Sequence, residues 1–226
     1  HYAEIINEIC PELKETKAGE PLHSKRLPFL RNVISVGFKQ PGSLTFEEVM
    51  GRSDMVPMEE VYRLAAAVRS GDVCNMQYTS GTTGFPKGVM LTHYNVVNNG
   101  KCIGDRMGLS TADRMMIQVP MFHCFGMVLS MTASMTHGAT LCPMPYFSAK
   151  ASLTCINQVK ITAFNGVPTM FIAMFHHPDY RKTDFSHMRT GIMAGSGCPA
   201  ELMRRAAQED EMHMVGIVSV YGQTES

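Results

Sequence analysis

The chain has 226 residues, of which 45% are hydrophobic and 18% are charged, and its 20 basic and 20 acidic residues give a formal net charge of zero. This balance is typical of a soluble globular protein, and the length accommodates one large domain or two small ones. No basic block stands out, which argues against nucleic-acid binding, and no apolar run reaches the length of a transmembrane segment.

Short apolar runs alternate with segments of helical periodicity along the chain. The predicted strands span residues 30–36, 72–78, 88–91, 115–119, 139–142, 161–164, 190–194 and 217–220. The predicted helices span residues 2–10, 45–50, 58–69, 93–107, 124–136, 149–159, 168–176 and 199–209. Thr92 and Ser148 are expected N-caps, and Pro168 is expected in the first turn of its helix. The alternation predicts an α/β fold with a largely parallel sheet, in which ligands bind at loops after the carboxyl ends of strands.

The cysteine pattern indicates the redox compartment of the protein, and the methionine content indicates how its core is packed. The seven cysteines are scattered and include no Cys-x-x-Cys pair, which predicts reduced thiols in a cytoplasmic compartment, with an organelle matrix left open. The 20 methionines are interpreted as flexible core filler. His176-His177 has no accompanying Cys/His set with zinc spacing, which argues against a zinc site.

Residues 78–88 read Tyr-Thr-Ser-Gly-Thr-Thr-Gly-Phe-Pro-Lys-Gly and form the densest group of anion-binding features. Glycines allow close approach of the backbone, successive N–H groups can form an anion-binding nest, and hydroxyls and a lysine add donors. This chemistry suits a polyphosphate, although a solvated turn has a similar composition. Lys87 precedes Gly88 rather than Ser or Thr, so the loop is not the common P-loop, and a magnesium ligand must come from elsewhere.

Residues 221–225, Tyr-Gly-Gln-Thr-Glu, follow the last predicted strand. Glu225 offers the hard oxygen that Mg²⁺ prefers, the Thr224 hydroxyl can bond a phosphate, and Tyr221 offers a flat face to an adenine. Taken alone this pentapeptide is a weak signal, because Gly after a strand is often a turn and Glu is usually solvated.

Two further stretches contain candidate residues. His123 lies among aromatic residues in Pro-Met-Phe-His-Cys-Phe-Gly (120–126), where a buried structural histidine is the alternative. The small residues of 194–199 follow a predicted strand, and this loop can start a helix with Pro199 at its first position. Ser196 lacks the spacing of a nucleophile elbow.

In this order, the segments 78–88, 120–126, 166–169, 194–199 and 221–225 resemble the motifs of the adenylate-forming superfamily, which contains acyl-CoA synthetases, peptide-synthetase adenylation domains and luciferases. The resemblance covers most of the chain and is strongest to medium- and long-chain fatty acyl-CoA ligases. It implies a role for His123 in orienting the carboxylate, and roles for Thr224 and Glu225 toward phosphate and Mg²⁺. It also implies phosphate binding by Thr79, Ser80, Gly81, Thr82, Thr83, Gly84 and Lys87, and adenine or acyl binding by Gly195, Ser196, Gly197, Tyr221, Gly222 and Gln223.

The implied reaction is activation of a carboxylic acid, a medium- or long-chain fatty acid, by MgATP to an acyl-adenylate, followed by acyl transfer to coenzyme A. The amino-acid-activating branch has an aspartate in the region of 120–126, and this chain has none there, which favours an acid without an α-amine.

The resemblance further implies that residues 1–226 are a fragment of the AMP-binding (adenylation) domain. The family's ribose-binding aspartate, hinge and small C-terminal domain with its lysine do not occur in these residues, and neither does an N-terminal portion. We therefore expect the isolated chain to be inactive. An NTPase of unrelated chemistry and a non-catalytic nucleotide-binding module remain as alternatives.

Overall fold

The computed structural model describes residues 2–80 and 84–225, and the chain divides into two compact units, residues 1–68 and 69–226. Gly81, Thr82 and Thr83, which are predicted phosphate-binding residues, lie outside the described residues. None of the described helices combines the length and apolar character of a membrane span.

The first unit contains short elements around a small core of Cys10, Leu13 and Leu22. β1 and β2 pair in parallel over two residues each. Its elements are α1 (Tyr2–Ile9), η1 (Pro11–Lys14), β1 (Ile34–Ser35), β2 (Leu44–Thr45), α2 (Phe46–Met50), η2 (Ser53–Met55) and α3 (Met58–Ala67).

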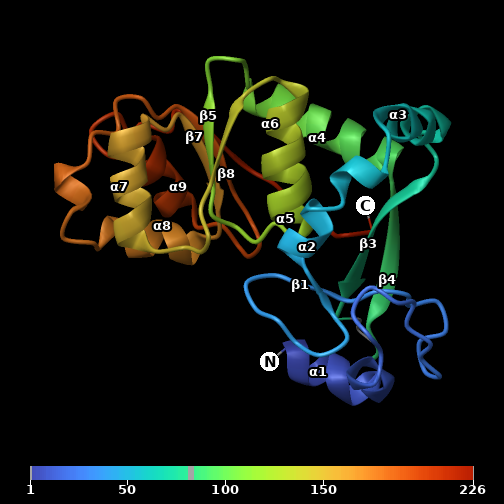
Figure 1. Cartoon of the computed structure of the whole chain (residues 1–226). Coiled ribbons are helices and arrows are strands. Elements are labelled where there is room, and N and C mark those ends of the chain that lie inside the picture. The colour runs from blue at the N-terminus through green and yellow to red at the C-terminus, as the bar shows by residue number, and fades with distance from the viewer. Residues whose placement is uncertain (1, 81–83, 226) are drawn as a thin grey trace. The chain divides into compact units, whose positions relative to one another are not determined.

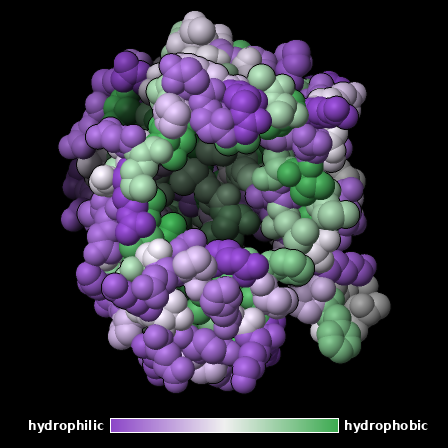
Figure 2. Space-filling model, turned by 45° about the vertical axis from the view of Figure 1, so that its right-hand side comes forward, coloured by the Kyte–Doolittle hydropathy of each residue, from purple (hydrophilic) through white to green (hydrophobic). Residues whose placement is uncertain are grey.

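Two predictions for this unit need correction. The strand expected at 30–36 is only β1, because β2 offers two residues for pairing. α3 ends at Ala67 rather than at residue 69, and the apolar side chains of Val61 and Leu64, and of Val68 just after it, are exposed. Figure 2 shows hydrophobic and hydrophilic residues mixed on one face of the molecule.

The second unit is built on a five-stranded sheet with the order β6-β5-β7-β8-β9, in which every neighbouring pair is parallel. Parallel strands need long crossover connections, which helices supply here. The strands are β5 (Arg114–Ile117), β6 (Thr140–Pro143), β7 (Ala163–Gly166), β8 (Thr190–Met193) and β9 (Gly216–Ser219). This sheet confirms the predicted α/β class.

Helices cover both faces of this sheet (Figure 1). Successive strand residues point to opposite faces, so Met116 packs in one core with α7 (Ala149–Val159) and α8 (Pro168–Phe175). Its neighbours Met115 and Ile117 belong to a second core, which includes residues of α4 (His93–Met107) and α6 (Ala133–Thr136). α9 (Ala200–Ala207) lies on the same face as α7. The unit is therefore a three-layer α/β/α arrangement.

The helix predicted over 124–136 is interrupted. It consists of α5 (Cys124–Gly126), the π-helix η3 (Met127–Thr132) and α6, while a short helix η4 (Tyr180–Lys182) follows α8. The side-chain hydroxyls of Ser130 and Thr132 donate to the carbonyl oxygens five residues earlier, those of Phe125 and Met127, at 3.0 and 2.9 Å. A π turn widens the helix at this point, and such turns are common near functional sites.

The predicted phosphate loop joins an antiparallel hairpin. β3 (Val73–Thr79) pairs with β4 (Lys87–Thr92), with Thr79 opposite Lys87. Only residues 80–86 connect the two strands, and a connection this short joins antiparallel strands, whereas a parallel crossover needs about a dozen residues or more. The predicted phosphate loop therefore belongs to an antiparallel hairpin and does not leave the parallel sheet.

Helix starts follow most of the predicted signals. Thr92 and Asn95 form a reciprocal capping box at α4, with side-chain to backbone distances of 3.2 and 3.1 Å, and Pro168 occupies the first turn of α8. Ser148 is the N-cap residue of α7 as predicted, but its side chain makes no capping bond, and only its carbonyl oxygen accepts one, from Ser152 N at 2.8 Å. Pro199 is the N-cap of α9 rather than its first helical residue.

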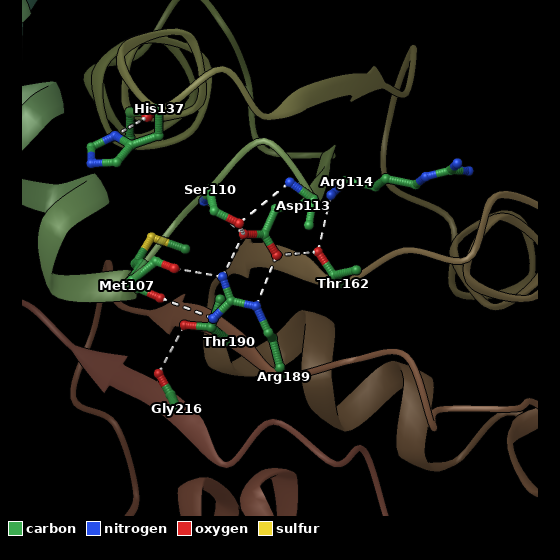
Figure 3. A network of polar contacts seen from close by, with 12 residues as sticks. Met107, Ser110, Asp113, Arg114, His137, Thr162, Arg189, Thr190 and Gly216 are labelled. Carbon is green, nitrogen blue, oxygen red and sulfur yellow. Dashed lines mark hydrogen bonds and ion pairs between the residues drawn. The ribbon is translucent and has the colours of Figure 1, made fainter.

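An ion pair between the buried Asp113 and the partly exposed Arg189 joins the amino-terminal ends of three strands (Figure 3). Asp113, at 1% exposure, accepts hydrogen bonds from Arg189 Nε at 2.8 Å and Thr162 Oγ1 at 2.7 Å, and Arg189 Nη2 also bonds its second oxygen. Burial raises the pKa of Asp113, but the bonds from Arg189, Thr162 and Ser110 outweigh it and hold that pKa below its ordinary value. The pair lies before β5, β7 and β8, at the edge opposite the loops considered next.

Candidate active site

The loops after β5, β8 and β9 leave the same carboxyl edge of the parallel sheet. β6 lies on one side of β5 and β7 on the other, so the strand order reverses at β5. Ligands of open α/β sheets bind outside the carboxyl ends at such a switch point. The His123 stretch leaves the sheet there.

A cavity of about 920 Å³ lies at these loops, which is large enough for a small-molecule ligand. Its lining combines the loops with residues of β4, α4 and η3. Val96 and Ile103 of α4 and Val128 and Leu129 of η3 contribute an apolar wall. The sequence-predicted residues that line it are His123, Gly195, Ser196, Gly197, Tyr221, Gly222, Gln223, Thr224 and Glu225.

The described part of the predicted phosphate loop does not line this cavity. Ser80, Gly84 and Lys87 are exposed and Thr79 is half-buried, at the turn end of the hairpin. The strand that follows the loop does reach the cavity, through residues 89–91. The structure therefore brings His123 together with the predicted residues of 195–197 and 221–225. The described residues of the predicted phosphate loop, 78–88, do not join them.

A main-chain contact defines the hydrogen-bonding state of His123. Its Nδ1 accepts a hydrogen bond from Phe125 N at 3.1 Å, so in the neutral ring the proton lies on Nε2. The side chain is exposed at the cavity, so His123 is not a buried structural histidine. It offers an N–H donor to a ligand oxygen.

Thr224 places the loop after β9 next to the loop after β5. Its Oγ1 lies 4.0 Å from the Sγ of Cys124, although the two residues are 100 positions apart in the chain. Tyr221 is 88% exposed, and its hydroxyl accepts a bond from Gln223 Nε2 at 2.8 Å. One face of the tyrosine ring is therefore open to a planar ligand.

Gly195 is required by the geometry of its loop. Its φ is +86°, and a Cβ there would lie 2.9 Å from Cγ1 of Val167. Both the backbone conformation and the packing exclude a side chain. A Cβ at Gly197 or Gly222 would meet no atom within 4 Å, so these glycines leave space beside the backbone for a ligand.

Close helix packing brings α4 to the cavity wall. A Cβ on Gly100 would lie 2.7 Å from Thr132, and one on Gly104 would lie 2.3 Å from the His137 ring. These two glycines, four residues apart on one helix face, therefore allow α4 to approach η3 and α6 closely.

Comparison with known proteins identifies the family to which the chain belongs. Residues 7–226 match the family described as AMP-binding enzyme. The chain belongs to the AMP-binding enzyme family. The protein named "Putative acyl-CoA synthetase YngI" of Bacillus subtilis (strain 168) is 46% identical over 226 residues, covering 100% of this chain and 41% of its own length. Mouse "Medium-chain acyl-CoA ligase ACSF2, mitochondrial" is 38% identical over 234 residues, covering 100% of this chain and 37% of its own.

Among solved structures, the anthranilate CoA ligase AuaEII in complex with anthranoyl-AMP matches with a TM-score of 0.70 and 26% identity, over 86% of this chain and 36% of that chain. This AMP-binding enzyme chain thus spans about two-fifths of the length of the two curated relatives, at 41% and 37%.

Glu225 fits a magnesium ligand in this AMP-binding enzyme chain. Its carboxylate lines the cavity, is exposed, and makes no ion pair within residues 2–80 and 84–225. The described residues contain no group of three or more His, Cys, Asp or Glu side chains able to hold a metal. A magnesium ion here would take its other ligands from phosphates and water, as Mg²⁺ commonly does.

Sequence reasoning missed the apolar wall and Cys124. Val96 and Ile103 are seven residues apart on α4 and so share a face, which is a signal the sequence did contain. The guanidinium of Arg205 lies 4.0 Å from the centre of the Phe175 ring, and its Nε bonds Glu211 at 3.1 Å.

Proposed function

We propose that the protein containing this chain activates a carboxylic acid with MgATP to an acyl-adenylate and then transfers the acyl group to coenzyme A. The observation that carries the proposal is the cavity of about 920 Å³, where His123, the 195–197 glycine loop and residues 221–225 meet an apolar wall. Membership of the AMP-binding enzyme family supports it.

The first step joins two anions, because a carboxylate oxygen attacks the α-phosphorus of ATP and pyrophosphate leaves. The enzyme must therefore offset negative charge and hold the reactants in line. We assign charge compensation to Lys87 and to the donors of residues 79–84, because β4, which begins at Lys87, reaches the cavity through residues 89–91. The Nε2–H of His123 donates to an oxygen of the carboxylate or the α-phosphate and orients the attack.

Residues 221–225 hold the nucleotide in this proposal. The open face of Tyr221 packs on adenine, and the Thr224 hydroxyl donates to a phosphate oxygen. Glu225, with phosphate oxygens, would hold Mg²⁺. A bound magnesium ion supplies charge neutralisation for the departing pyrophosphate.

The apolar wall suggests the substrate class. Val96, Ile103, Val128 and Leu129 would contact a hydrocarbon chain. The medium-chain acids named for mouse ACSF2 agree with this reading. We propose a fatty acid of medium length, with longer chains less favoured.

Two further proposals concern the protein as a whole. All seven cysteines are free, which is consistent with a reducing cytoplasmic or organelle-matrix location. We also propose that residues 1–226 alone do not turn over, because the resembling family uses an aspartate, a hinge and a lysine that are not among them.

The test is acyl-CoA formation, followed by mass spectrometry, with protein expressed from the complete coding sequence. Acetate, octanoate, palmitate, benzoate and an amino acid are offered with MgATP and coenzyme A. The proposal predicts octanoyl-CoA as the leading product, with AMP formed in equal amount. ATP hydrolysis without acid would indicate an unrelated NTPase, and MgATP binding without product would indicate a binding module.

A further inference from the structure

Asn165 of β7 has a fully buried amide, at 0% exposure, beneath the cavity-lining elements. Its Nδ2 donates to Leu129 O and Ser130 Oγ, both at 2.9 Å, and its Oδ1 accepts from Ile192 N at 2.9 Å. A buried amide is costly unless its groups are bonded, and here both of its polar ends have partners. The amide joins the π-helix η3 to the strand β8.

From Asn165 a run of hydrogen bonds leads to His123. Ser130, itself 0% exposed, donates through Oγ to Phe125 O at 3.0 Å. The N–H of Phe125 then donates to His123 Nδ1 at 3.1 Å. The main chain of Phe125 is thus held through its carbonyl oxygen on one side and its N–H on the other.

The second branch of the network reaches another wall of the cavity. Ile192, whose N–H bonds Asn165, lies two residues before Ala194, which begins the lining segment 194–198. One buried amide therefore fixes the elements that carry the histidine and the glycine loop relative to each other.

We propose that Asn165 is a positioning residue for the adenylation step, acting through Ser130 and Phe125 to hold the imidazole of His123 with its proton on Nε2. The inference rests on the proposed function for its kinetic consequence, while its structural consequence is measured without turnover. Asn165 itself touches neither substrate nor nucleotide.

The kinetic test is a double-mutant cycle on carboxylate-dependent ATP–pyrophosphate exchange by the complete protein. Asn165→Ala is expected to lower kcat about tenfold with a smaller change in the KM for ATP, and this loss should shrink to about twofold or less in a His123→Ala background. Ser130→Ala removes one hydroxyl from the same run and serves as the milder variant if Asn165→Ala folds poorly. An equal loss in both backgrounds would overturn the proposal, because a general packing defect does not depend on His123.

Asn157→Ala is the matched control. Asn157 Oδ1 also accepts a backbone N–H, that of Asp184 at 2.8 Å, but it lies in α7, whose residues do not line the cavity. Asn157→Ala should leave kcat unchanged both in the wild type and in the His123→Ala background.

The second readout is the ¹⁵N spectrum of the His123 imidazole, which needs no activity. The wild type should show the Nε2–H form, and Asn165→Ala and Ser130→Ala should show a mixture of tautomers. An unchanged tautomer in both variants would overturn the positioning role. Absence of exchange by the wild type with every acid, beside the expected spectral change, would instead reject the proposed function alone.

Discussion

His123 illustrates how one main-chain contact selects the chemistry of a side chain. Since Phe125 N–H bonds Nδ1, the free Nε2–H of the neutral ring is a donor. A donor stabilises oxygen charge that develops during attack on phosphorus, whereas a general base would need the opposite tautomer. The residue is accordingly assigned to orientation and charge stabilisation.

Replacement of His123 by Ala should therefore lower kcat of adenylation by about 10²-fold, as loss of one such donor does in other enzymes. Steady-state pyrophosphate exchange measures the change. His187→Ala provides the control, because its side chain is 42% exposed and lies outside the cavity lining. A variant with wild-type kcat would remove His123 from the reaction.

Asp113 carries a prediction about stability rather than catalysis. Its pKa is held low in the folded protein, so its stabilising contribution is present above the unfolded-state pKa of about 4 and is lost as the pH falls through the folded value. Asp113→Asn should cost about 1 to 3 kcal/mol of unfolding free energy near neutral pH, because the bonds from Arg189 and Thr162 lose a charged acceptor while the partly exposed guanidinium stays solvated.

Chemical denaturation at several pH values measures this cost. The difference between Asp113→Asn and wild type should narrow as the solution is made acidic, below about pH 4. A difference that stays constant with pH would show that the carboxylate charge is not the source of the stability.

At the scale of elements, the packing of α4 is set by its two buried glycines. Gly104→Ala gains helix propensity of about 1 kcal/mol, but its Cβ would meet the His137 ring at 2.3 Å and Ala133 O at 3.0 Å. We expect the clash to dominate and the protein to lose about 1 to 2 kcal/mol in unfolding free energy.

Thermal and denaturant unfolding of Gly104→Ala test this expectation. Lys101→Ala, on the exposed side of the same helix, should change stability by no more than about 0.5 kcal/mol. A more stable Gly104→Ala protein would mean that α4 does not need its close contact with α6.

Local signals explain which elements the sequence predicted well. α4 and α7 have the predicted bounds, 93–107 and 149–159, because apolar periodicity is encoded within each segment and, at α4, the capping box of Thr92 and Asn95 marks the start. The π turn at Met127–Thr132 and the antiparallel partner of β3 depend on contacts far along the chain, and no local pattern marks them. The length of β1 likewise depends on β2.

At the scale of the whole molecule, the order of the motifs along the chain indicated the family and the site more strongly than any single motif did. His123, Gly195 and Glu225 were each weak signals, and the parallel sheet brings their loops to one edge, where they line one cavity. The buried Asn165 and Asp113 networks were not predicted, because a polar residue inside a strand or loop looks like any other in sequence. The position of Lys87 relative to the cavity depends on the hairpin, which the sequence did not predict.

The most direct test of the central claim is carboxylate-dependent ATP–pyrophosphate exchange by protein expressed from the complete coding sequence, with the 226-residue chain measured alongside. The account predicts exchange with octanoate, a loss of about 10²-fold or more in Lys87→Ala and in Glu225→Ala, and no exchange by the isolated chain. Absence of exchange with any acid, in a protein that binds MgATP tightly, would contradict the account.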